Sequence, residues 1–409
     1  MRYFLTLGIF FTSLVCTFAQ EELRNNFACH ERGGIGNTLE KLRKGETVRV
    51  AYLGGSITMA GNGWRSQTTA WLQEAYPDAD VREINAGVSG TGSRLADFRL
   101  GRDVLSQRPD LLFIEFAVND GGESVERIQR QMEGLVLQTW QANPRTDIVF
   151  VYTFCTGFAR NLRDGKLPRS ASAMEAVADF YGIPSVNFMK RVVEMEAAGR
   201  LVFTSDRPST DAVLVFSKDG THPGPEGHAL YVQDLREAFD KMNDSSPQTH
   251  RFDLARTFST DPILDGKMFA VTASMLRGNW KKMESGDRHF HFTQRLDEIW
   301  TTDTPGDSLT FSFRGTEAYL YDVVGPDGGQ VWVTVDGKKS EKPLPRNDRY
   351  CIDHRSYRVT YGLVAAGLDP TKVHTVTLTL DTEKPFVEGG GRMLRVAKIL
   401  LRGALCEPD

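Results

Sequence analysis

Beyond its first twenty residues, the chain has no apolar run long enough to cross a bilayer, which requires about 20 apolar residues. It also lacks a basic stripe, because 49 lysines and arginines against 53 acidic residues give a formal net charge of −4 that is spread along the chain. No repeat or low-complexity segment stands out. These absences argue against a transmembrane segment in the mature chain and against a nucleic-acid partner.

Cysteine is scarce as well. The chain has five cysteines in 409 residues, and four of them, Cys29, Cys155, Cys351 and Cys406, lie beyond residue 20. Their wide spacing argues against a metal site, and we expect none. Export would permit disulfides, and a Cys351–Cys406 bond could close the second half of the chain. Four cysteines allow three connectivities, and the sequence does not choose between them.

Residues 1–19 have the pattern of a secretory signal peptide. A positive start precedes an almost uncharged apolar stretch, residues 4–18, with small residues at the cleavage position. We therefore expect a secreted or periplasmic protein. Two alternatives stay open: an uncleaved membrane anchor, for which the run is short, and a lipid-anchored form cleaved at Cys16. The second is disfavoured because Val15 stands where a small residue normally precedes the cysteine.

About 390 residues remain, which exceeds one typical hydrophobic core and indicates two domains. After an N-terminal extension, 20–44, strand-like and helix-like patterns alternate over residues 45–244. The clearest helix is Val125–Ala142, whose apolar residues recur at helical period. The predicted strands are Val48–Leu53, Val81–Asn85, Asp110–Phe116, Ile148–Thr153 and Ser185–Phe188. Such alternation predicts a parallel sheet covered by helices, with functional residues at the carboxyl ends of the strands.

The pattern changes after the polar stretch Asn243–Pro247, which we interpret as a linker. Beyond it, helical periodicity nearly vanishes, and turn residues separate short strand-like runs. The predicted strands are Leu309–Phe313, Ala318–Val324, Val331–Val335, Tyr357–Tyr361, Val373–Leu380 and Val396–Leu401. Residues 253–409 are therefore expected to form an all-β sandwich of jelly-roll-like type.

Four separated blocks carry residues suited to chemistry. Ser56 follows the first predicted strand, Gly90 lies in a glycine-rich loop after the second, and Asn119 follows the third. Far downstream, Asp219 and His222 are close enough in sequence to share one loop. A serine with an Asp/His pair that can activate it is the set of catalytic residues typical of a serine hydrolase. An asparagine amide at a strand end can donate a hydrogen bond to an oxyanion.

In this order and at these spacings, the blocks resemble the SGNH (GDSL-type) hydrolases over residues 45–242. The resemblance implies a flavodoxin-like three-layer α/β/α domain and an esterase or deacylase without a cofactor. It assigns Ser56 as the nucleophile, His222 as the general base and Asp219 as the group that orients the imidazole. It also implies an oxyanion hole made by the N–H groups of Ser56 and Gly90 and the side chain of Asn119.

The match has two departures from the family pattern. Gly55 stands where an aspartate usually precedes the serine, and Ala117 stands where a glycine is usual. Neither removes a catalytic group, so they bear on the substrate more than on the reaction. Ser89 is a rival nucleophile, but its surroundings lack the closing glycine of the α/β-hydrolase elbow. The loop 87–93 matches neither common nucleotide-binding spacing.

Candidate substrate contacts follow the nucleophile closely. Trp64 and Arg65 would either line the acyl or sugar pocket or pack and cap the first helix, and the sequence favours neither reading. His289 and His291 alternate in a strand-like stretch, but no further metal ligands accompany them, so ordinary surface histidines are expected.

The combination of a secreted SGNH domain with a β-sandwich resembles bacterial carbohydrate esterases. It implies removal of O-acetyl or other short acyl groups from a poly- or oligosaccharide. One alternative is a lipid or aryl esterase, although no apolar excess surrounds the motifs. A second is a noncatalytic glycan-binding surface protein, which the retention of the motif residues disfavours. The β domain would bind glycan through tryptophans such as Trp280, Trp300 and Trp332, or support the catalytic domain. The oligomeric state is not predictable.

Overall fold

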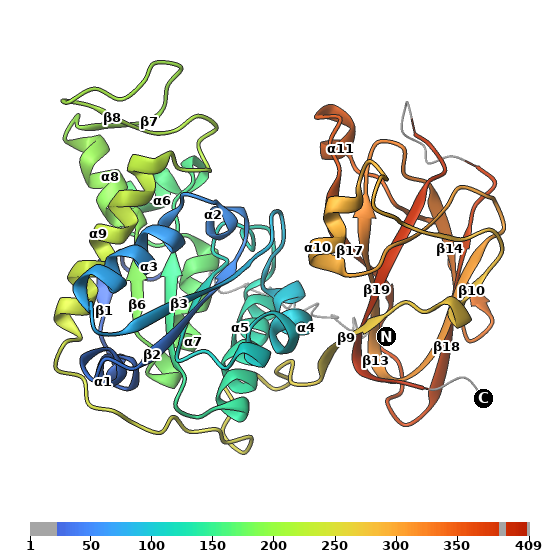
Figure 1. Ribbon diagram of the computed structural model, residues 1–409, viewed down its shortest axis with the longest axis horizontal. Helices are drawn as coiled ribbons and strands as arrows, with labels where there is room; N and C mark the ends of the chain where they lie inside the picture. Colours follow the sequence, from blue (N-terminus) through green and yellow to red (C-terminus); the bar gives the residue numbers. More distant parts are fainter. Residues whose placement is uncertain (1–22, 384–389, 407–409) are drawn as a thin grey trace, which may run out of the picture.

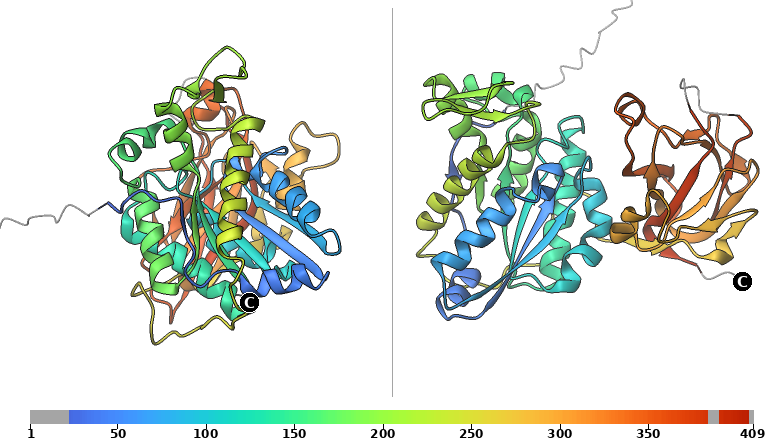
Figure 2. Two further views of the ribbon diagram at one scale, coloured as in Figure 1. Left: turned by 90° about the vertical axis from the view of Figure 1, so that its left-hand side faces the viewer. Right: turned by 45° about the horizontal axis from the view of Figure 1, so that its top comes forward.

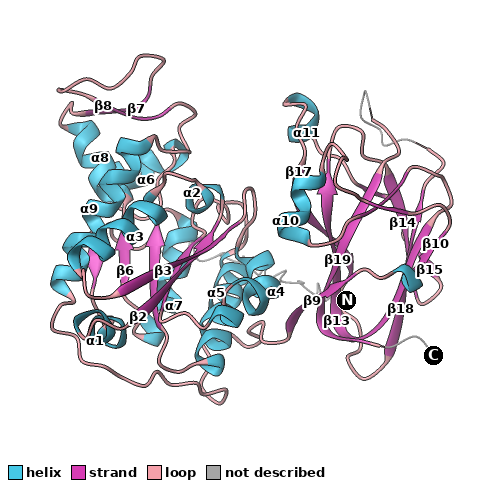
Figure 3. Ribbon diagram, viewed as in Figure 1, coloured by secondary structure: helices cyan, strands magenta, loops and turns pink. Residues whose placement is uncertain are grey.

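The computed structural model describes residues 23–383 and 390–406 and consists of an α/β domain beside an antiparallel β domain (Figure 1). Figure 3 shows the contrast, with nearly all helices in the first domain and mostly strands in the second. The predicted signal peptide, 1–19, lies outside the described residues. Among the helices that are described, none is both long and apolar enough to traverse a bilayer.

The α/β domain is built on a six-stranded sheet in the order β1-β6-β5-β4-β2-β3. All neighbours are parallel except β1, which pairs antiparallel with β6. Its strands are β1 (Cys29–His30), β2 (Thr47–Gly54), β3 (Asp80–Gly87), β4 (Leu111–Glu115), β5 (Asp147–Tyr152) and β6 (Ser185–Asn187). The five parallel strands have the flavodoxin-like order, so the predicted fold class is confirmed.

Helices cover both faces of this sheet. They are α1 (Gly36–Arg43), α2 (Ser56–Met59), α3 (Trp64–Ala75), α4 (Ser93–Asp103), α5 (Val125–Ala142), α6 (Ala159–Arg163), α7 (Arg169–Tyr181), α8 (Met189–Ala197) and α9 (Pro225–Lys241). Contacts group α4, α5 and α7 on one face, and α3, α8 and α9 on the other. Helix α5 has the predicted bounds, since the hydroxyl of Ser124 accepts from the N–H of Arg127 at its start and one face is buried. A two-stranded sheet, β7 (Leu201–Thr204) and β8 (Leu214–Ser217), projects from this domain in Figure 1.

The residues expected to form an N-terminal extension are part of the domain. Strand β1 adds an edge to the sheet through β6. Leu39 and Leu42 of α1 are buried in the main core. Residues 29–43 are therefore integrated into the α/β domain instead of preceding it.

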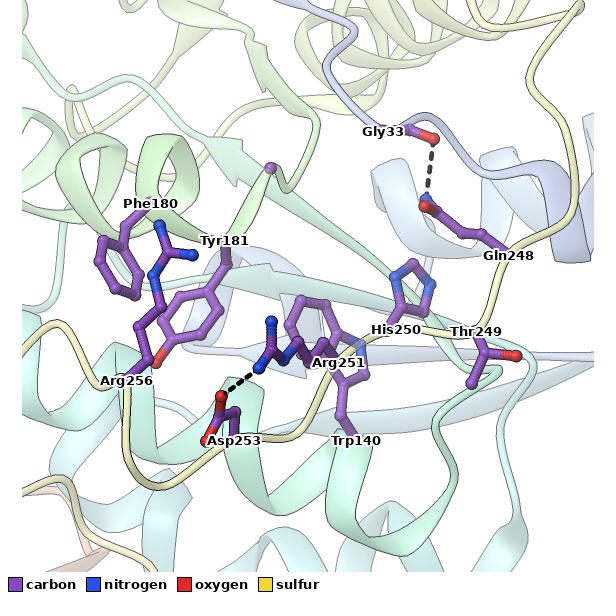
Figure 4. A pocket seen from close by; sticks show the side chains of 11 residues that line it. Gly33, Trp140, Phe180, Tyr181, Gln248, Thr249, His250, Arg251, Asp253 and Arg256 are labelled. Carbon is purple, nitrogen blue, oxygen red and sulfur yellow. Dashed lines mark hydrogen bonds and ion pairs between the residues drawn. The ribbon is translucent and has the colours of Figure 1, made fainter.

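The predicted linker opens a longer segment, residues 243–265, that is fixed along the α/β domain. The main chain of Gln248 exchanges hydrogen bonds with the side chain of Asn37. The His250 ring stacks on Trp140 with centroids 4.8 Å apart, and the Ser259 N–H donates to the buried carboxylate of Glu133. A pocket of about 330 Å³ lies along this segment. Figure 4 shows side chains that line it, among them Trp140, Tyr181 and His250. The segment is therefore not a free linker.

The second domain is a continuous antiparallel sheet in which two predicted strands are one. Leu309–Phe313 and Ala318–Val324 both belong to β13 (Ser308–Val324), which bends at an irregularity around Gly315. The other elements are β9 (Gly266–Ala270), β10 (Leu276–Arg277), β11 (Lys281–Lys282), α10 (Thr293–Leu296), β12 (Trp300–Thr302), β14 (Gln330–Val335), β15 (Lys338–Lys339), β16 (Leu344–Pro345), α11 (Arg349–Asp353), β17 (Arg358–Ala365), β18 (Val373–Leu380) and β19 (Leu394–Leu405). The first half of β13 lies between β10 and β18, and its second half lies between β17 and β19.

The second half of β13 is buried on both faces because the two domains share a hydrophobic cluster. Ala318 and Leu320 point into the core of the β domain. The alternate residues Tyr319 and Tyr321 pack in a cluster with Val88, Leu95 and Phe98 of the α/β domain. The alternation along a strand thus divides β13 between two cores. In Figure 2, the domains meet where α4 and α5 approach the β domain.

The sequence leaves two features of the β domain open, the pairing of its cysteines and the role of its tryptophans. Cys351 and Cys406 are free thiols, and the other described cysteines, Cys29 and Cys155, are unpaired too. Cys351 is buried inside the domain, so its thiol behaves as a small core side chain. The tryptophans do not form a platform: Trp280 and Trp300 pack against the domain core. The ammonium of Lys339 lies 3.7 Å from the ring centroid of Trp332.

Candidate active site

Ser56 stands at the turn between β2 and α2. Strand β2 lies between β4 and β3, and its residues from Val50 onward are buried or nearly so, as expected for a strand covered by helices on both faces. The chain therefore emerges at the carboxyl edge of the sheet, where Ser56 begins α2. This is the position at which parallel α/β sheets form their sites.

The structure brings Ser56 together with the distant Asp/His pair. The Ser56 hydroxyl lies 2.7 Å from Nε2 of His222, whose Nδ1 lies 2.6 Å from Oδ2 of Asp219. The three side chains thus form a continuous hydrogen-bonded chain. The His222 side chain is 51% exposed, so the reacting end of this chain is open to solvent. The arrangement allows an imidazole with a fixed ring orientation to take a proton from the serine.

The Asp219 loop is shaped to hold a carboxylate. Oδ1 of Asp219 accepts from the main-chain N–H groups of Thr221 and His222 and from the Ser217 hydroxyl, at 2.8–2.9 Å. Burial opposes ionisation of Asp219, but the hydrogen bonds from His222, Thr221 and Ser217 outweigh it and hold its pKa well below the usual range. Gly220 has φ +80°, and a side chain there would meet Thr156, so the loop requires glycine.

The two other predicted oxyanion groups follow the strands on either side of β2. Gly90 follows β3 and has φ +68°, a conformation in which glycine is favoured. Asn119 follows β4, and its amide packs against Gly55, so closely that a Cβ on Gly55 would overlap the Asn119 oxygen. In this structure the contact leaves no room for a side chain at position 55. Ser56, Gly90 and Asn119 therefore come from three neighbouring strands.

Asn119→Ala is expected to lower kcat by roughly 10²–10³-fold with little change in KM. An amide that donates to a developing oxyanion acts mainly in the transition state, so its loss affects turnover more than substrate binding. Steady-state kinetics on a small acetyl ester measures both constants. A raised KM with an unchanged kcat would make Asn119 a substrate-binding residue instead.

The structure decides between the two readings of Trp64 and Arg65, and it corrects the one in which they line the substrate pocket. Trp64 is fully buried in the core and makes an edge contact with Tyr52. Arg65 is 4% exposed, donates to the carbonyl oxygens of Thr58 and Ala60, and pairs with Glu83. Neither side chain is open to substrate. Arg65 instead caps the short helix α2, which begins at Ser56.

Two residues near the site carry no signal in the local sequence. Met59, at the end of α2, is an exposed large hydrophobic side chain, and its sulfur lies 3.5 Å from the Ser89 hydroxyl. Arg358 comes from β17 of the other domain. A Cβ built on Gly90 would lie 3.2 Å from Nη1 of Arg358, while Asp348 holds the rest of that guanidinium. Only the tertiary fold reveals that Arg358 is close to the Gly90 loop.

A pocket of about 670 Å³ includes His222 and Asp219 in its wall. Its far side is formed by the loop between β7 and β8, and its lining carries the charged side chains Asp206, Arg207 and Lys218. The space next to His222 is thus open and partly charged.

No metal centre is evident in the part of the chain that the structure describes, because no three potential ligands cluster there. His289 and His291 have ring centroids 6.5 Å apart. His289 packs against Tyr357 with centroids 3.7 Å apart and the ring planes tilted by 33°. The aromatic contact accounts for the position of His289.

Comparisons with known proteins agree with this geometry. The model of the GDSL-like lipase/acylhydrolase family matches residues 52–230. An acetylxylan esterase of Geobacillus stearothermophilus is 35% identical over 185 residues, which is 44% of this chain and 81% of that protein. A solved two-domain esterase active on acetylated mannans has a TM-score of 0.72 and 21% identity, covering 91% of this chain and 94% of that one. Its complex with mannopentaose gives a TM-score of 0.71. The structural likeness shows a shared two-domain fold, and the sequence matches show that the chain belongs to the GDSL-like lipase/acylhydrolase family and is a carboxylic ester hydrolase.

Proposed function

We propose that this protein is an exported carbohydrate acetylesterase, which removes O-acetyl groups from a poly- or oligosaccharide through Ser56, His222 and Asp219. The observation that carries the proposal is the hydrogen-bonded chain from the Ser56 hydroxyl through His222 to Asp219, with both contacts below 3 Å. The activities named for the relatives, on acetylated xylan and acetylated mannans, support the substrate class.

In the proposed reaction, Nε2 of His222 takes the hydroxyl proton of Ser56 as its oxygen attacks the acetyl carbon. The N–H groups of Ser56 and Gly90 and the amide of Asn119 stabilise the negative oxygen of the tetrahedral intermediate. Collapse breaks the bond to the sugar oxygen, which leaves as a hydroxyl with the proton from His222. A water molecule, deprotonated by His222, then releases acetate and restores Ser56.

The surroundings of the site suit a bulky polar leaving group. A sugar chain must reach the serine from solvent, and the exposed His222 leaves that approach open. The adjacent pocket includes the charged side chains of Asp206, Arg207 and Lys218, which can hydrogen bond to the hydroxyl groups of a sugar. Arg358 of the β domain lies beside the Gly90 loop and would be a further donor to a sugar bound there.

Acetate release from acetylated mannan and acetylated xylan tests this function. We expect release from at least one of these polymers, and little hydrolysis of a long-chain ester such as p-nitrophenyl palmitate, because the open pocket is not an acyl channel. The same polymers after alkaline deacetylation are the blank. Faster hydrolysis of the palmitate ester would favour the lipid-esterase alternative, and no hydrolysis of any ester would favour a noncatalytic glycan-binding protein.

Export is part of the proposal and rests on the pattern of residues 1–19. Amino-terminal sequencing of protein recovered outside the cytoplasm would begin at Gln20 if the signal peptide is cleaved as predicted. A lipid-modified terminus at Cys16 would support the surface-anchored alternative.

A further inference from the structure

A buried carboxyl group lies directly beneath the nucleophile loop. Glu115 is the last residue of β4, pairs in register with Gly54 of β2 and is 0% exposed. Its Oε2 accepts from the hydroxyl of Thr58 at 2.9 Å, and its Oε1 accepts from the hydroxyl of Thr153 at 2.7 Å. It also interacts with the N–H of Gly55. One side chain thus ties the loop that carries Ser56 to the ends of two other strands.

A second buried carboxyl group holds the other side of the site. Asp120 is 2% exposed and accepts from the Ser93 N–H at 3.1 Å and from the Ser93 hydroxyl at 2.6 Å. Ser93 begins α4, directly after the Gly90 loop. A Cβ on Gly92 would overlap Oδ1 of Asp120, so this loop and the carboxyl group are in close contact.

Asn119 lies between these two carboxyl groups in the sequence, and its amide packs against Gly55. The chain after β4 therefore contacts both loops that supply the proposed main-chain donors. We infer that Glu115 and Asp120 are positioning residues for the oxyanion hole: Glu115 fixes the Ser56 loop, and Asp120 fixes the Gly90 loop. The inference rests on the proposed function, because it takes Ser56 and Gly90 as the donors.

Packing alone does not explain these two groups. A buried carboxyl group is unfavourable unless it is hydrogen bonded, and apolar side chains of similar size fill a core at lower cost. Burial raises the pKa of Glu115 to about 7 and that of Asp120 to about 7, despite the hydroxyl donors that favour their ionised forms. The chain nevertheless keeps both groups at the edge of the sheet that carries Ser56.

The test is Glu115→Gln, which keeps the shape but turns one acceptor oxygen into a donor. On p-nitrophenyl acetate we expect kcat to fall by ~10- to 100-fold with little change in KM, since a small misplacement of a donor affects mainly the transition state. The matched control is Glu133→Gln. Glu133 is also 0% exposed and accepts hydrogen bonds from the Ser259 N–H and the Tyr181 hydroxyl. It is a control because it lies inside α5, ~12 Å along the helix from its first residue, and not in the Ser56 or Gly90 loop.

Rates are normalised to the folded fraction from circular dichroism. A loss in Glu115→Gln no larger than that in Glu133→Gln, or a raised KM with an unchanged kcat, would overturn the inference. Asp120→Asn is expected to behave like Glu115→Gln. These outcomes are separable from a failure of the proposed function, because that failure would appear as undiminished ester turnover by Ser56→Ala or as no turnover by the wild type.

Thr58 provides a second variant if Glu115→Gln does not fold. Thr58→Val removes the hydroxyl but keeps the shape, and it should lower kcat, whereas Thr58→Ser should retain most of it. Because both residues act through one contact, the double variant Glu115→Gln/Thr58→Val should lose less than the product of the single losses. Fully multiplicative losses, or equal activity of Thr58→Val and Thr58→Ser, would contradict positioning through Thr58.

Discussion

Ser56→Ala is expected to reduce turnover of a small acetyl ester by ~10⁴- to 10⁶-fold, the range observed when a catalytic triad loses its nucleophile. The Ser56 hydroxyl is 2.7 Å from His222, and without it there is no group to receive the acyl chain. The fold should persist, because the change removes one oxygen at a partly exposed position. Initial rates and a thermal melt of the same preparation measure both effects.

Ser89→Ala is the matched control for this experiment. Ser89 lies next to the site, with its hydroxyl 3.5 Å from the Met59 sulfur, so it tests whether any serine in this region is required. We expect nearly normal turnover. If Ser56→Ala kept wild-type activity while Ser89→Ala lost it, Ser89 and not Ser56 would be the nucleophile.

His222→Ala should be about as damaging as Ser56→Ala, since the two residues act as one unit and the double variant should lose little more. Asp219→Ala is expected to be milder, because it removes the orienting partner and leaves the base in place. The lowered pKa of Asp219 keeps that carboxylate ionised throughout the assay range. A general base can accept a proton only in its unprotonated form, so activity should fall toward low pH.

A pH–rate profile from 5 to 8, measured with the three single variants, tests the role of His222. His291→Ala replaces an exposed histidine of the β domain and should leave both rate and profile unchanged. A flat profile for the wild-type enzyme would contradict a histidine base.

Local patterns in the sequence predict the elements whose burial follows a simple period. Helix α5 has its predicted bounds because one face carries apolar residues at helical spacing and Ser124 supplies an N-cap. The parallel strands are short buried runs between helices, so their order along the chain indicates the sheet. The proposed catalytic residues are predictable for the same reason, because each follows a recognisable strand or lies in a motif.

Elsewhere, tertiary contacts decide the outcome. The segment around Gly315, between two predicted strands, reads as a turn in the sequence. In the structure β13 continues through it with a bulge. Trp64 follows the nucleophile in sequence, yet the helix that it begins turns its ring into the core. Glu115 reads as an ordinary strand end, and its partner Thr153 becomes visible only when β5 lies beside β4. No local pattern encodes the pairing of residues that are far apart in the chain.

The position of Arg358 beside Gly90 limits how this protein can evolve or be re-engineered. Here, the guanidinium beside the oxyanion loop belongs to β17, and Asp348 of the same domain anchors it. Replacing the β domain would therefore change the wall of the active site together with the shared cluster around Tyr319. A chimaera that exchanges one domain must therefore preserve the packing of the two domains and the position of Arg358 beside Gly90.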